Sequence, residues 1–311
     1  MSGDIGKVYF VGAGPGDSEL LTVKAKRLIE NSDVIFHDSL VGDGVLDWIP
    51  ENAEVHNVGK KPGGGRTPQD KINRMMATQA TSGKQVVRLK GGDPNVFGRG
   101  GEEAEYLASE GVVFELVPGV SSAVAAPGVA GIPVTHREYS SSFTVVTGHE
   151  DPTKDKSALD WDSLASNVEA GGTLVILMGV RRLPDNVDAL LKNGVDEDAP
   201  TAIVQKATWN NECTVTGTLN NITEKARNAG VDPPAVTVVG DVVDVRRNVA
   251  DWLGGTASAA EEKIEPRRNE ALRGHCRGGH TDSGEGSVVD TEHSDTDHGV
   301  VTDRYAEMFD S

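Results

Sequence analysis

The residues from Leu89 to Glu103, LKGGDPNVFGRGGEE, hold five glycines and carry charged residues near both ends. A surface loop usually needs only one or two glycines to turn. Five of them leave a third of the stretch without side chains and expose peptide N–H and C=O groups, which are strong hydrogen-bonding partners. The stretch therefore predicts a binding loop in which a small molecule lies directly against the backbone.

A second glycine-rich loop, GAGPGD, covers residues 12–17 and follows a predicted strand. A dinucleotide-binding unit would have G-x-G-x-x-G here and an acidic residue about 20 positions later. Asp38 meets the second condition, but position 17 is aspartate and Pro15 stiffens the turn. Asp17 at a helix start would also repel a phosphate, and the sequence has no G-x-x-x-x-G-K-[ST] motif. A polyphosphate ligand is therefore disfavoured.

Bare peptide groups suit a compact zwitterionic or cationic ligand better than a polyphosphate. S-adenosylmethionine is such a ligand, since it combines an adenine, a ribose, an amino-acid end and a sulfonium. Tight turns alone would explain one glycine loop. Two such loops, each after a predicted parallel strand, favour a ligand cleft at the carboxyl ends of the strands. A nicotinamide-dependent oxidoreductase or a nucleotide-binding module remains the alternative from another class.

The elements that must position these loops follow a regular pattern. Helices are predicted over residues 18–32, 68–83 and 101–111, and strands at 8–12, 33–38, 53–59, 86–90 and 112–117. Strands that alternate with helices of about ten to fifteen residues predict βα units and a mainly parallel sheet.

The pattern breaks at a polar connector, residues 131–142, and then restarts. A hairpin expected around Thr208–Cys213 makes the second sheet mixed, with predicted strands at 142–148, 173–179, 201–207, 213–219 and 235–243. We predict an N-terminal α/β domain at 1–138, a C-terminal α/β domain at 139–254, and a disordered acidic and polar tail at 255–311. The tail lacks the large apolar residues that could offset its ordering entropy.

The formal net charge is −18, and the acidic residues are spread along the chain. Nucleic-acid binders carry a basic footprint, so this class of partner is disfavoured. A dispersed acidic shell favours a halophilic source, because concentrated salt screens the self-repulsion. No apolar run reaches the roughly 20 residues that span a bilayer, and the N-terminus does not resemble a signal peptide.

Cys213 and Cys276 are the two cysteines and lie far apart in the sequence. We therefore expect no disulfide framework and a reducing cytoplasm. The spacing of the possible metal ligands in the tail matches no zinc pattern, so no metal is predicted for His275, Cys276, His280, His293 and His298.

A series of motifs then occurs in order along about residues 7–252. They are GAGPGD, FHDSLV, VGKK, TPQDKIN, VVRLKGGDPNVFGRGGEEAE, VPGVSSA, GIPVTHRE, VTGHE, LMG, TVTGTL and VVGDVV. Together they resemble the uroporphyrinogen-III C-methyltransferases, a family of the tetrapyrrole methylase superfamily. The run 89–103 joined to GIPVTHR is the most specific part of the resemblance.

The resemblance implies an α/β, two-domain tetrapyrrole methylase fold, with a mainly parallel N-terminal sheet, a mixed C-terminal sheet and the cofactor cleft between the domains. It implies a homodimer that uses S-adenosylmethionine to methylate uroporphyrinogen III at C2 and C7, giving precorrin-2 for sirohaem and cobalamin synthesis.

The resemblance also assigns roles to residues. Asp38 is expected to accept a proton and Lys60 to donate one, while Arg99 and Glu102 position the substrate or handle protons. The carboxylates of the substrate would meet Lys61, Arg66, Lys90 and Arg137. The cofactor would be lined by Pro15, Gly91, Gly92, Asp93, Val96, Ser121, Ser122, Met178 and Ala207.

Some features depart from the family pattern or leave alternatives. Asn95 replaces the usual aromatic residue, Ala207 replaces a glycine, and Arg66 lies near the place of a missing histidine. A later precorrin methylase and a diphthine synthase are alternatives within the superfamily, and the 86–103 run disfavours both. We expect Gly92→Val to abolish cofactor binding and to leave the fold intact.

Overall fold

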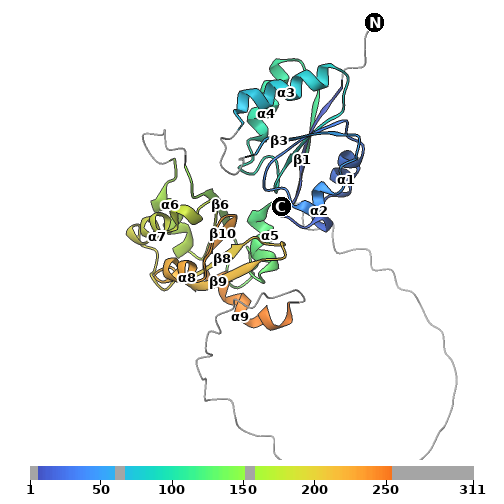
Figure 1. Cartoon of the computed structure of the whole chain (residues 1–311). Coiled ribbons are helices and arrows are strands. Elements are labelled where there is room, and N and C mark those ends of the chain that lie inside the picture. Colours follow the sequence, from blue (N-terminus) through green and yellow to red (C-terminus); the bar gives the residue numbers. More distant parts are fainter. Residues whose placement is uncertain (1–5, 60–66, 151–157, 254–311) are drawn as a thin grey trace, which may run out of the picture. The chain divides into compact units, whose positions relative to one another are not determined.

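The computed structural model describes residues 6–59, 67–150 and 158–253. Within these ranges, two five-stranded sheets carry helices on both faces (Figure 1). The first sheet has the order β3-β2-β4-β1-β5, and all of its neighbouring strands run parallel. Its strands are β1 (Val8–Gly12), β2 (Val34–His37), β3 (Glu54–Asn57), β4 (Val86–Lys90) and β5 (Phe114–Val117). The predicted parallel sheet is confirmed.

Side chains of the first sheet alternate between two apolar layers, as the period of a strand requires. Val8, Phe10 and Val86 pack against α3 (Gln69–Thr81) and α4 (Gly100–Ser109). Val11 and Leu89 face the opposite layer with α1 (Val23–Glu30) and α2 (Asp43–Leu46). Both faces are therefore covered, and a charged residue in a central strand must lie in one of these layers.

The second sheet has the order β6-β7-β10-β8-β9. Its strands are β6 (Phe143–Thr147), β7 (Thr173–Leu177), β8 (Pro200–Gln205), β9 (Cys213–Thr218) and β10 (Ala235–Val239). β6 pairs parallel with β7, whereas the β7–β10, β10–β8 and β8–β9 pairs are antiparallel. The predicted mixed sheet and the hairpin around Thr208–Cys213 are confirmed.

Helices also cover both faces of the second sheet. One layer contains α6 (Trp161–Glu169), α7 (Leu183–Lys192) and α8 (Ile222–Asn228). The other contains α5 (Ser122–Val129), whose Ala123 and Ala126 pack against Val175 and Val204. α9 (Val245–Val249) follows, and single 3-10 turns lie at Ser18–Leu20, Val180–Arg182, Asp241–Asp244 and Ala250–Trp252.

The domain boundaries at 138 and 254 stay predictions. Because α5 packs on the second sheet, its packing favours a crossing between the sheets before Ser122 and after β5. The predicted tail, residues 255–311, lies outside the described residues. No helix among the described residues is long and apolar enough to be a candidate membrane span.

Glu115 of β5 ties the first sheet to α1 by pairing with Lys7 at 2.5 Å and with Lys24. Hydrogen bonds from Lys24 and Lys7 lower the pKa of Glu115 from 4.5 to about 2. The folded state therefore binds this proton less readily than the unfolded chain, and the stabilisation is present above pH 4.5 and lost as the pH falls toward 2.

We expect Glu115→Gln to remove this pH dependence. Urea unfolding of both proteins from pH 5 to pH 2 should show their stabilities converging at the acid end. The difference should also shrink in concentrated KCl, because the pairs are partly exposed and screened. A constant difference across this pH range would contradict the assignment.

Candidate functional site

Parallel strands end at one edge of a sheet, and the predicted glycine loops start there. The loop 12–17 follows β1, Asp38 follows β2, the loop beginning at Gly91 follows β4, and residues 118–121 follow β5. The structure thus brings to one edge the N-terminal part of the predicted site. The four strands β2, β4, β1 and β5 are consecutive neighbours in the sheet.

The glycine loops bind each other directly. Gly14 donates its N–H to the carbonyl of Gly92 at 3.2 Å, and Gly92 donates back to Gly14 at 2.7 Å. A Cβ atom added at Gly12 would lie 2.5 Å from Gly119 Cα and 2.6 Å from the Gly92 oxygen. Several glycines therefore serve contacts between backbones, a role that the sequence interpretation did not assign to them.

Gly91 and Gly92 are different, because space remains beside them. An added Cβ would approach no closer than 3.5 Å at Gly91 and 3.7 Å at Gly92, which are ordinary contact distances. Gly98 and Gly100 face no such space, since an added Cβ would meet the Pro94 carbonyl oxygen at 2.5 Å and 2.6 Å. Gly101 also faces open space, but it lies on the exposed first turn of α4. The room within the turn that follows β4 thus lies at the first two glycines of the loop.

Asp93 holds the loop in shape. Its Oδ1 accepts the N–H of Asn95 at 2.8 Å, and its Oδ2 accepts the N–H of Gly119 at 3.1 Å. Both carboxylate oxygens are used within the protein, as in an Asx turn extended to a neighbouring loop. Asp93 therefore links the β4 loop to the β5 loop, whatever further role it has toward a cofactor.

A buried cluster of charges lies under this edge. Arg88 and Lys90 belong to β4 and are 1% and 2% exposed, and Glu103 of α4 is 0% exposed. Arg88 Nη2 donates to Asp38 Oδ1 at 2.6 Å, and Arg88 Nε donates to Glu103 Oε1 at 3.2 Å. Lys90 Nζ donates to Glu103 Oε2 at 3.0 Å and lies 4.0 Å from Asp38 Oδ2. Two cations and two acids thus form one connected charge cluster.

The alternation of the strands explains this cluster. Arg88 and Lys90 share the parity of Val86, so they face α3 and α4. In the parallel register, Phe36 lies opposite Arg88, which places Asp38 beside Lys90. Gly12 lies opposite Lys90 on the other side and adds no side chain to the layer.

Burial lowers the pKa of Lys90 from its usual 10.5. The neighbouring Arg88 acts in the same direction, while Glu103 and Asp38 oppose it. The prediction that Lys90 grips substrate carboxylates is untested, but the geometry disfavours a direct grip. Its ammonium group is 3% exposed and already bonded to Glu103.

We expect Arg88→Met to cost about 3–5 kcal/mol in the free energy of unfolding, because it removes the buried cation that pairs with both Glu103 and Asp38. Arg74→Met on the surface of α3 is the matched control. Arg74 pairs with Asp70 while 64% exposed, so its loss should cost about 0–1 kcal/mol. Urea unfolding measures both, and equal costs would contradict the buried cluster.

Arg99 and Glu102 lie together at the start of α4. Arg99 Nε donates to Glu102 Oε2 at 3.0 Å, and both side chains are exposed. Arg99 also has a left-handed φ of 61°. The structure confirms neither a substrate nor a proton role, but it shows that the two predicted residues act as one exposed pair.

Backbone strain marks further residues near the predicted site. Left-handed φ angles in residues with a side chain cost energy and cluster at functional sites. Among the described residues they occur at Phe97, Arg99, Met178, Lys206 and Thr208. Arg99 and Met178 belong to the predicted site, and Lys206 and Thr208 flank the predicted Ala207. Sequence reasoning missed Phe97, Lys206 and Thr208.

The hairpin turn after β8 contacts the first glycine loop. Trp209 donates its indole N–H to the carbonyl of Pro15 at 3.0 Å, and Thr208 Oγ1 accepts the N–H of Asp17 at 3.1 Å. A Cβ atom added at Gly16 would lie 2.0 Å from Trp209 Nε1. Gly16 is therefore needed where this turn meets the loop. The buried Ala207 lies in the same turn.

The remaining predicted residues have varied settings. Ser121 caps α5 by accepting the Ala123 N–H at 3.2 Å, and Ser122 begins that helix. Val96 and Met178 are 37% and 52% exposed. Lys60, Lys61 and Arg66 lie outside the described residues.

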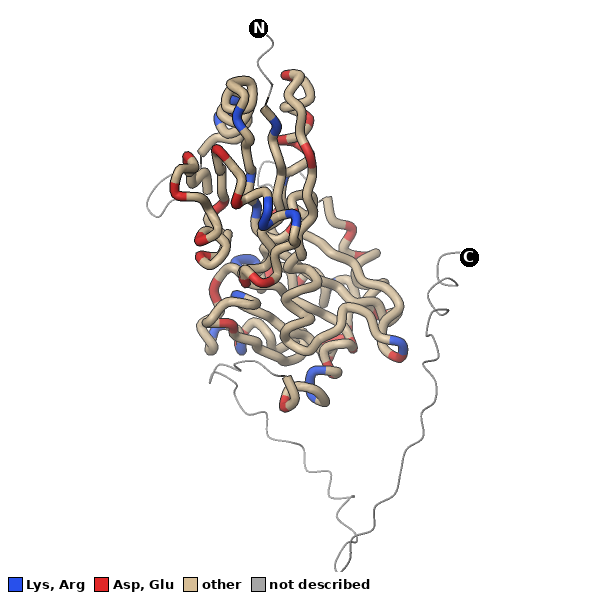
Figure 2. Tube along the Cα trace, turned by 90° about the vertical axis from the view of Figure 1, so that its right-hand side faces the viewer, with Lys and Arg blue, Asp and Glu red and all other residues tan. Residues whose placement is uncertain are grey.

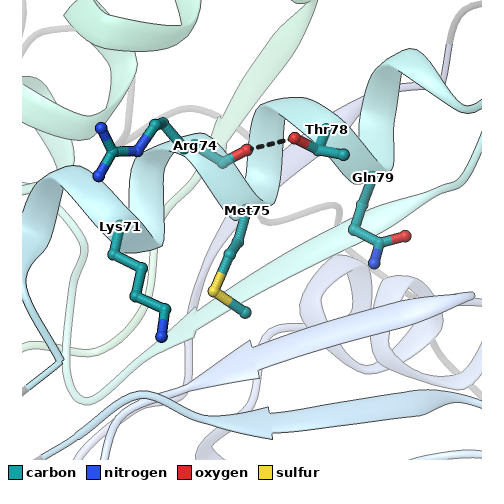
Figure 3. Close-up of a pocket in the computed structure, with 5 residues that line it drawn as sticks. All are labelled: Lys71, Arg74, Met75, Thr78 and Gln79. Carbon is teal, nitrogen blue, oxygen red and sulfur yellow. Dashed lines mark hydrogen bonds between the residues drawn. The ribbon is translucent and has the colours of Figure 1, made fainter.

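Two surface hollows are found away from the glycine loops. One, of about 250 Å³, runs along α3 and is formed by Lys71, Arg74, Met75, Thr78 and Gln79 (Figure 3). Lys71, Met75 and Gln79 extend in the same direction from the helix, and none of the five was predicted as a site residue. The other, of about 290 Å³, includes the predicted Arg137 within the connector 137–142. Among the described residues, no group of three or more His, Cys, Asp or Glu could hold a metal ion.

Comparison with known proteins gives the class. The family model described as Tetrapyrrole (Corrin/Porphyrin) Methylases matches residues 7–223, which is more than half of the chain. The chain belongs to the tetrapyrrole methylases, and the predicted family and fold class are confirmed.

Particular relatives narrow the comparison. A Methanosarcina barkeri protein named "S-adenosyl-L-methionine-dependent uroporphyrinogen III methyltransferase" is 54% identical over 243 residues, covering 78% of this chain and 94% of that protein. A "Uroporphyrinogen-III C-methyltransferase" of Priestia megaterium is 46% identical over 240 residues, covering 77% and 99%. A solved Thermus thermophilus structure described as "Uroporphyrin-III C-methyl transferase … complexed with S-adenyl homocysteine" has a TM-score of 0.66 and 41% identity, covering 77% of this chain and all of that one.

Proposed function

We propose that this protein is an S-adenosylmethionine-dependent C-methyltransferase of uroporphyrinogen III. It adds methyl groups at C2 and C7 and gives precorrin-2, which feeds sirohaem and cobalamin synthesis. The observation that carries the proposal is the open backbone at Gly91 and Gly92, at the edge where four parallel strands end. These glycines directly follow Lys90, whose ammonium group lies 4.0 Å from Asp38. Family membership and the names of the relatives support the choice of substrate.

The residues present fit the methyl donor. Gly91 and Gly92 leave room that a side chain would fill, and neither glycine loop contains the phosphate-binding motif G-x-x-x-x-G-K-[ST]. Exposed apolar side chains, Val96 and Met178, are suited to cover an adenosyl group. The cofactor cleft between the two sheets belongs to this proposal, and the contacts of Trp209 and Thr208 with the first glycine loop support it.

When bound, S-adenosylmethionine would supply an electrophilic methyl group to a carbon of the macrocycle and would leave as the neutral thioether S-adenosylhomocysteine, its methyl–sulfur bond breaking as the new C–C bond forms. Once the methyl group is attached, a proton must leave the macrocycle. Asp38 accepts this proton at its carboxylate, with Oδ1 held by Arg88. Orientation of the reactants and acid–base help together account for the catalysis.

The eight carboxylates of the macrocycle require cationic groups near the strand edge. We assign this role to Arg99 and Arg137, which are exposed, and to Lys60, Lys61 and Arg66 outside the described residues. Arginine is well suited, since its planar group binds a carboxylate through two hydrogen bonds. Lys60 remains the proposed proton donor and Glu102 the partner that positions Arg99.

The test is direct. Purified protein is incubated anaerobically in high salt with S-adenosylmethionine and uroporphyrinogen III, and the products are analysed by mass spectrometry. We expect addition of two methyl groups and formation of S-adenosylhomocysteine. Absence of any methylated tetrapyrrole while the protein binds S-adenosylmethionine would reject the substrate. Binding of NAD instead of S-adenosylmethionine in calorimetry would favour an oxidoreductase.

We also propose a homodimer and a saline, reducing cytoplasm. The charge of −18 supports the saline setting, and Figure 2 shows acidic positions recurring along the described chain with basic ones between them. Because salt screens repulsion among these acids, the melting temperature should rise as KCl increases from about 0.1 M to about 2 M. Calorimetry checks this, and light scattering in the same buffers measures the oligomeric state. A melting temperature that falls with KCl would contradict the saline setting.

A further inference from the structure

Glu103 is a fully buried acid that the proposed chemistry does not use. Its two oxygens accept three side-chain donors, namely Lys90 Nζ at 3.0 Å, Arg88 Nε at 3.2 Å and Gln69 Nε2 at 2.7 Å. A carboxylate so placed is held rigidly, because each oxygen is bonded and α3, α4 and β4 all contribute. Glu103 is therefore the anchor of the buried cluster.

The cluster reaches the strand edge at one point. The guanidinium of Arg88 bridges Glu103 and Asp38, and its remaining Nη1 donates to the carbonyl oxygens of Phe36 and Leu89 at 3.4 Å and 3.3 Å. Asp38 is 29% exposed, whereas the side chains of Arg88, Lys90 and Glu103 are at most 3% exposed. Asp38 is thus the member of the cluster that solvent can reach, and the buried residues Arg88, Lys90 and Glu103 act on the site through its carboxylate.

The two oxygens of Asp38 differ in their contacts. Oδ1 accepts the short hydrogen bond from Arg88. Oδ2 forms an ion pair with Lys90 Nζ at 4.0 Å, which is beyond hydrogen-bonding distance. Arg88 thus holds Oδ1 and leaves Oδ2 the freer oxygen. Lys90 holds a second cation near Oδ2 without bonding to it.

Burying the two cations and Glu103 is expensive, and an apolar core of the same shape is often equally stable or more so. We propose that Glu103 is a positioning residue: acting through Arg88 and Lys90, it orients Asp38 so that Oδ2 is presented to the reacting macrocycle. This inference rests on the proposed function. It adds a role for a residue that does not touch the substrate.

The test is a double-mutant cycle in the whole protein. Glu103→Gln keeps the shape but weakens the hold on Arg88 and Lys90. We expect kcat to fall about 10- to 100-fold, with the Kd for S-adenosylmethionine changed less than about 2-fold, as for lost orientation at the reacting group. In the Asp38→Asn background the same substitution should change kcat less than about 3-fold, because coupled residues are not additive. Glu105→Gln, on the exposed side of α4, is the matched control and should retain full activity.

Additive losses in the cycle, or a kcat unchanged by Glu103→Gln, would overturn the inference. Gln69→Met, which removes one bond to Glu103, gives a milder variant if Glu103→Gln does not fold, and it should lower kcat about 3- to 10-fold. The midpoints of urea unfolding of the four proteins in the cycle, namely the wild type, Glu103→Gln, Asp38→Asn and the double variant, provide a readout that does not depend on turnover. If the wild-type protein methylates nothing, the proposed function fails, while additive shifts in these midpoints would still overturn the link between Glu103 and Asp38.

Discussion

Gly91→Val should abolish methyl transfer by blocking the donor while leaving the protein folded. Gly91 has no left-handed φ, and an added Cβ meets Leu40 only at an ordinary 3.5 Å. The branched side chain would then occupy the space that we assign to the cofactor. We expect the affinity for S-adenosylmethionine to fall at least about 100-fold, equal to about 2.7 kcal/mol, measured by isothermal titration calorimetry.

Gly128→Val is the matched control. Gly128 lies in α5 with nothing within 4 Å of an added Cβ, so the variant should bind the donor like the wild-type protein. Melting temperatures of the two variants should lie within a few degrees of each other. Normal affinity for S-adenosylmethionine in folded Gly91→Val would contradict the proposed cofactor site at Gly91 and Gly92.

The corresponding change at Gly92 is a poorer test. Gly92 has a φ of +65°, which side-chain-bearing residues rarely adopt. The geometry therefore disfavours the expectation that Gly92→Val leaves the fold intact, since valine is strained there however much space surrounds it. Loss of binding in that variant would not separate a blocked cofactor from a distorted loop.

Asp38→Asn should lower kcat by about 10²–10⁴, the range expected when a general base is removed. Asparagine keeps an oxygen for Arg88, so the short contact of 2.6 Å can persist. Affinity for S-adenosylmethionine should therefore change less than about 2-fold. Single-turnover formation of the methylated product measures the chemical step apart from binding.

Asp47→Asn provides the control for Asp38→Asn, because Asp47 is an exposed acid at the C-terminal end of α2, the helix that follows Asp38 in the chain. It should retain the wild-type rate. If Asp38→Asn methylates within about 3-fold of the wild-type rate, another group accepts the proton, and the positioning role of Glu103 loses its target.

Much of the fold could be predicted from local patterns. VVRLK and VYFVG are short apolar runs before glycine loops, and they form β4 and β1 in the parallel sheet. The turn between β8 and β9 was also predictable from Thr208–Cys213. The position of α5 was not, because SAVAAPGV has little contrast between its faces, and its packing on the second sheet depends on tertiary contacts.

The buried cluster could have been found in part. A charged residue rarely lies in a central strand without a partner, and Arg88 and Lys90 alternate with Val87 and Leu89 in VVRLK. That spacing indicates two cations on one covered face. Their partner could not be predicted, because Glu103 lies at a helix start where an acid is favourable in any case. The fold alone decides that Glu103 points inward and Glu102 outward.

The mutual contacts of Gly12, Gly92 and Gly119 have a consequence for how this sequence can drift. An added methyl at Gly119 would lie 2.3 Å from the Gly92 oxygen, and one at Gly12 would collide with Gly119. Each of these two positions is thus closed by atoms that every amino acid possesses, so no exchange of side chains elsewhere can make room. Genetic change at Gly12 or Gly119 must await a shift of the main chain itself.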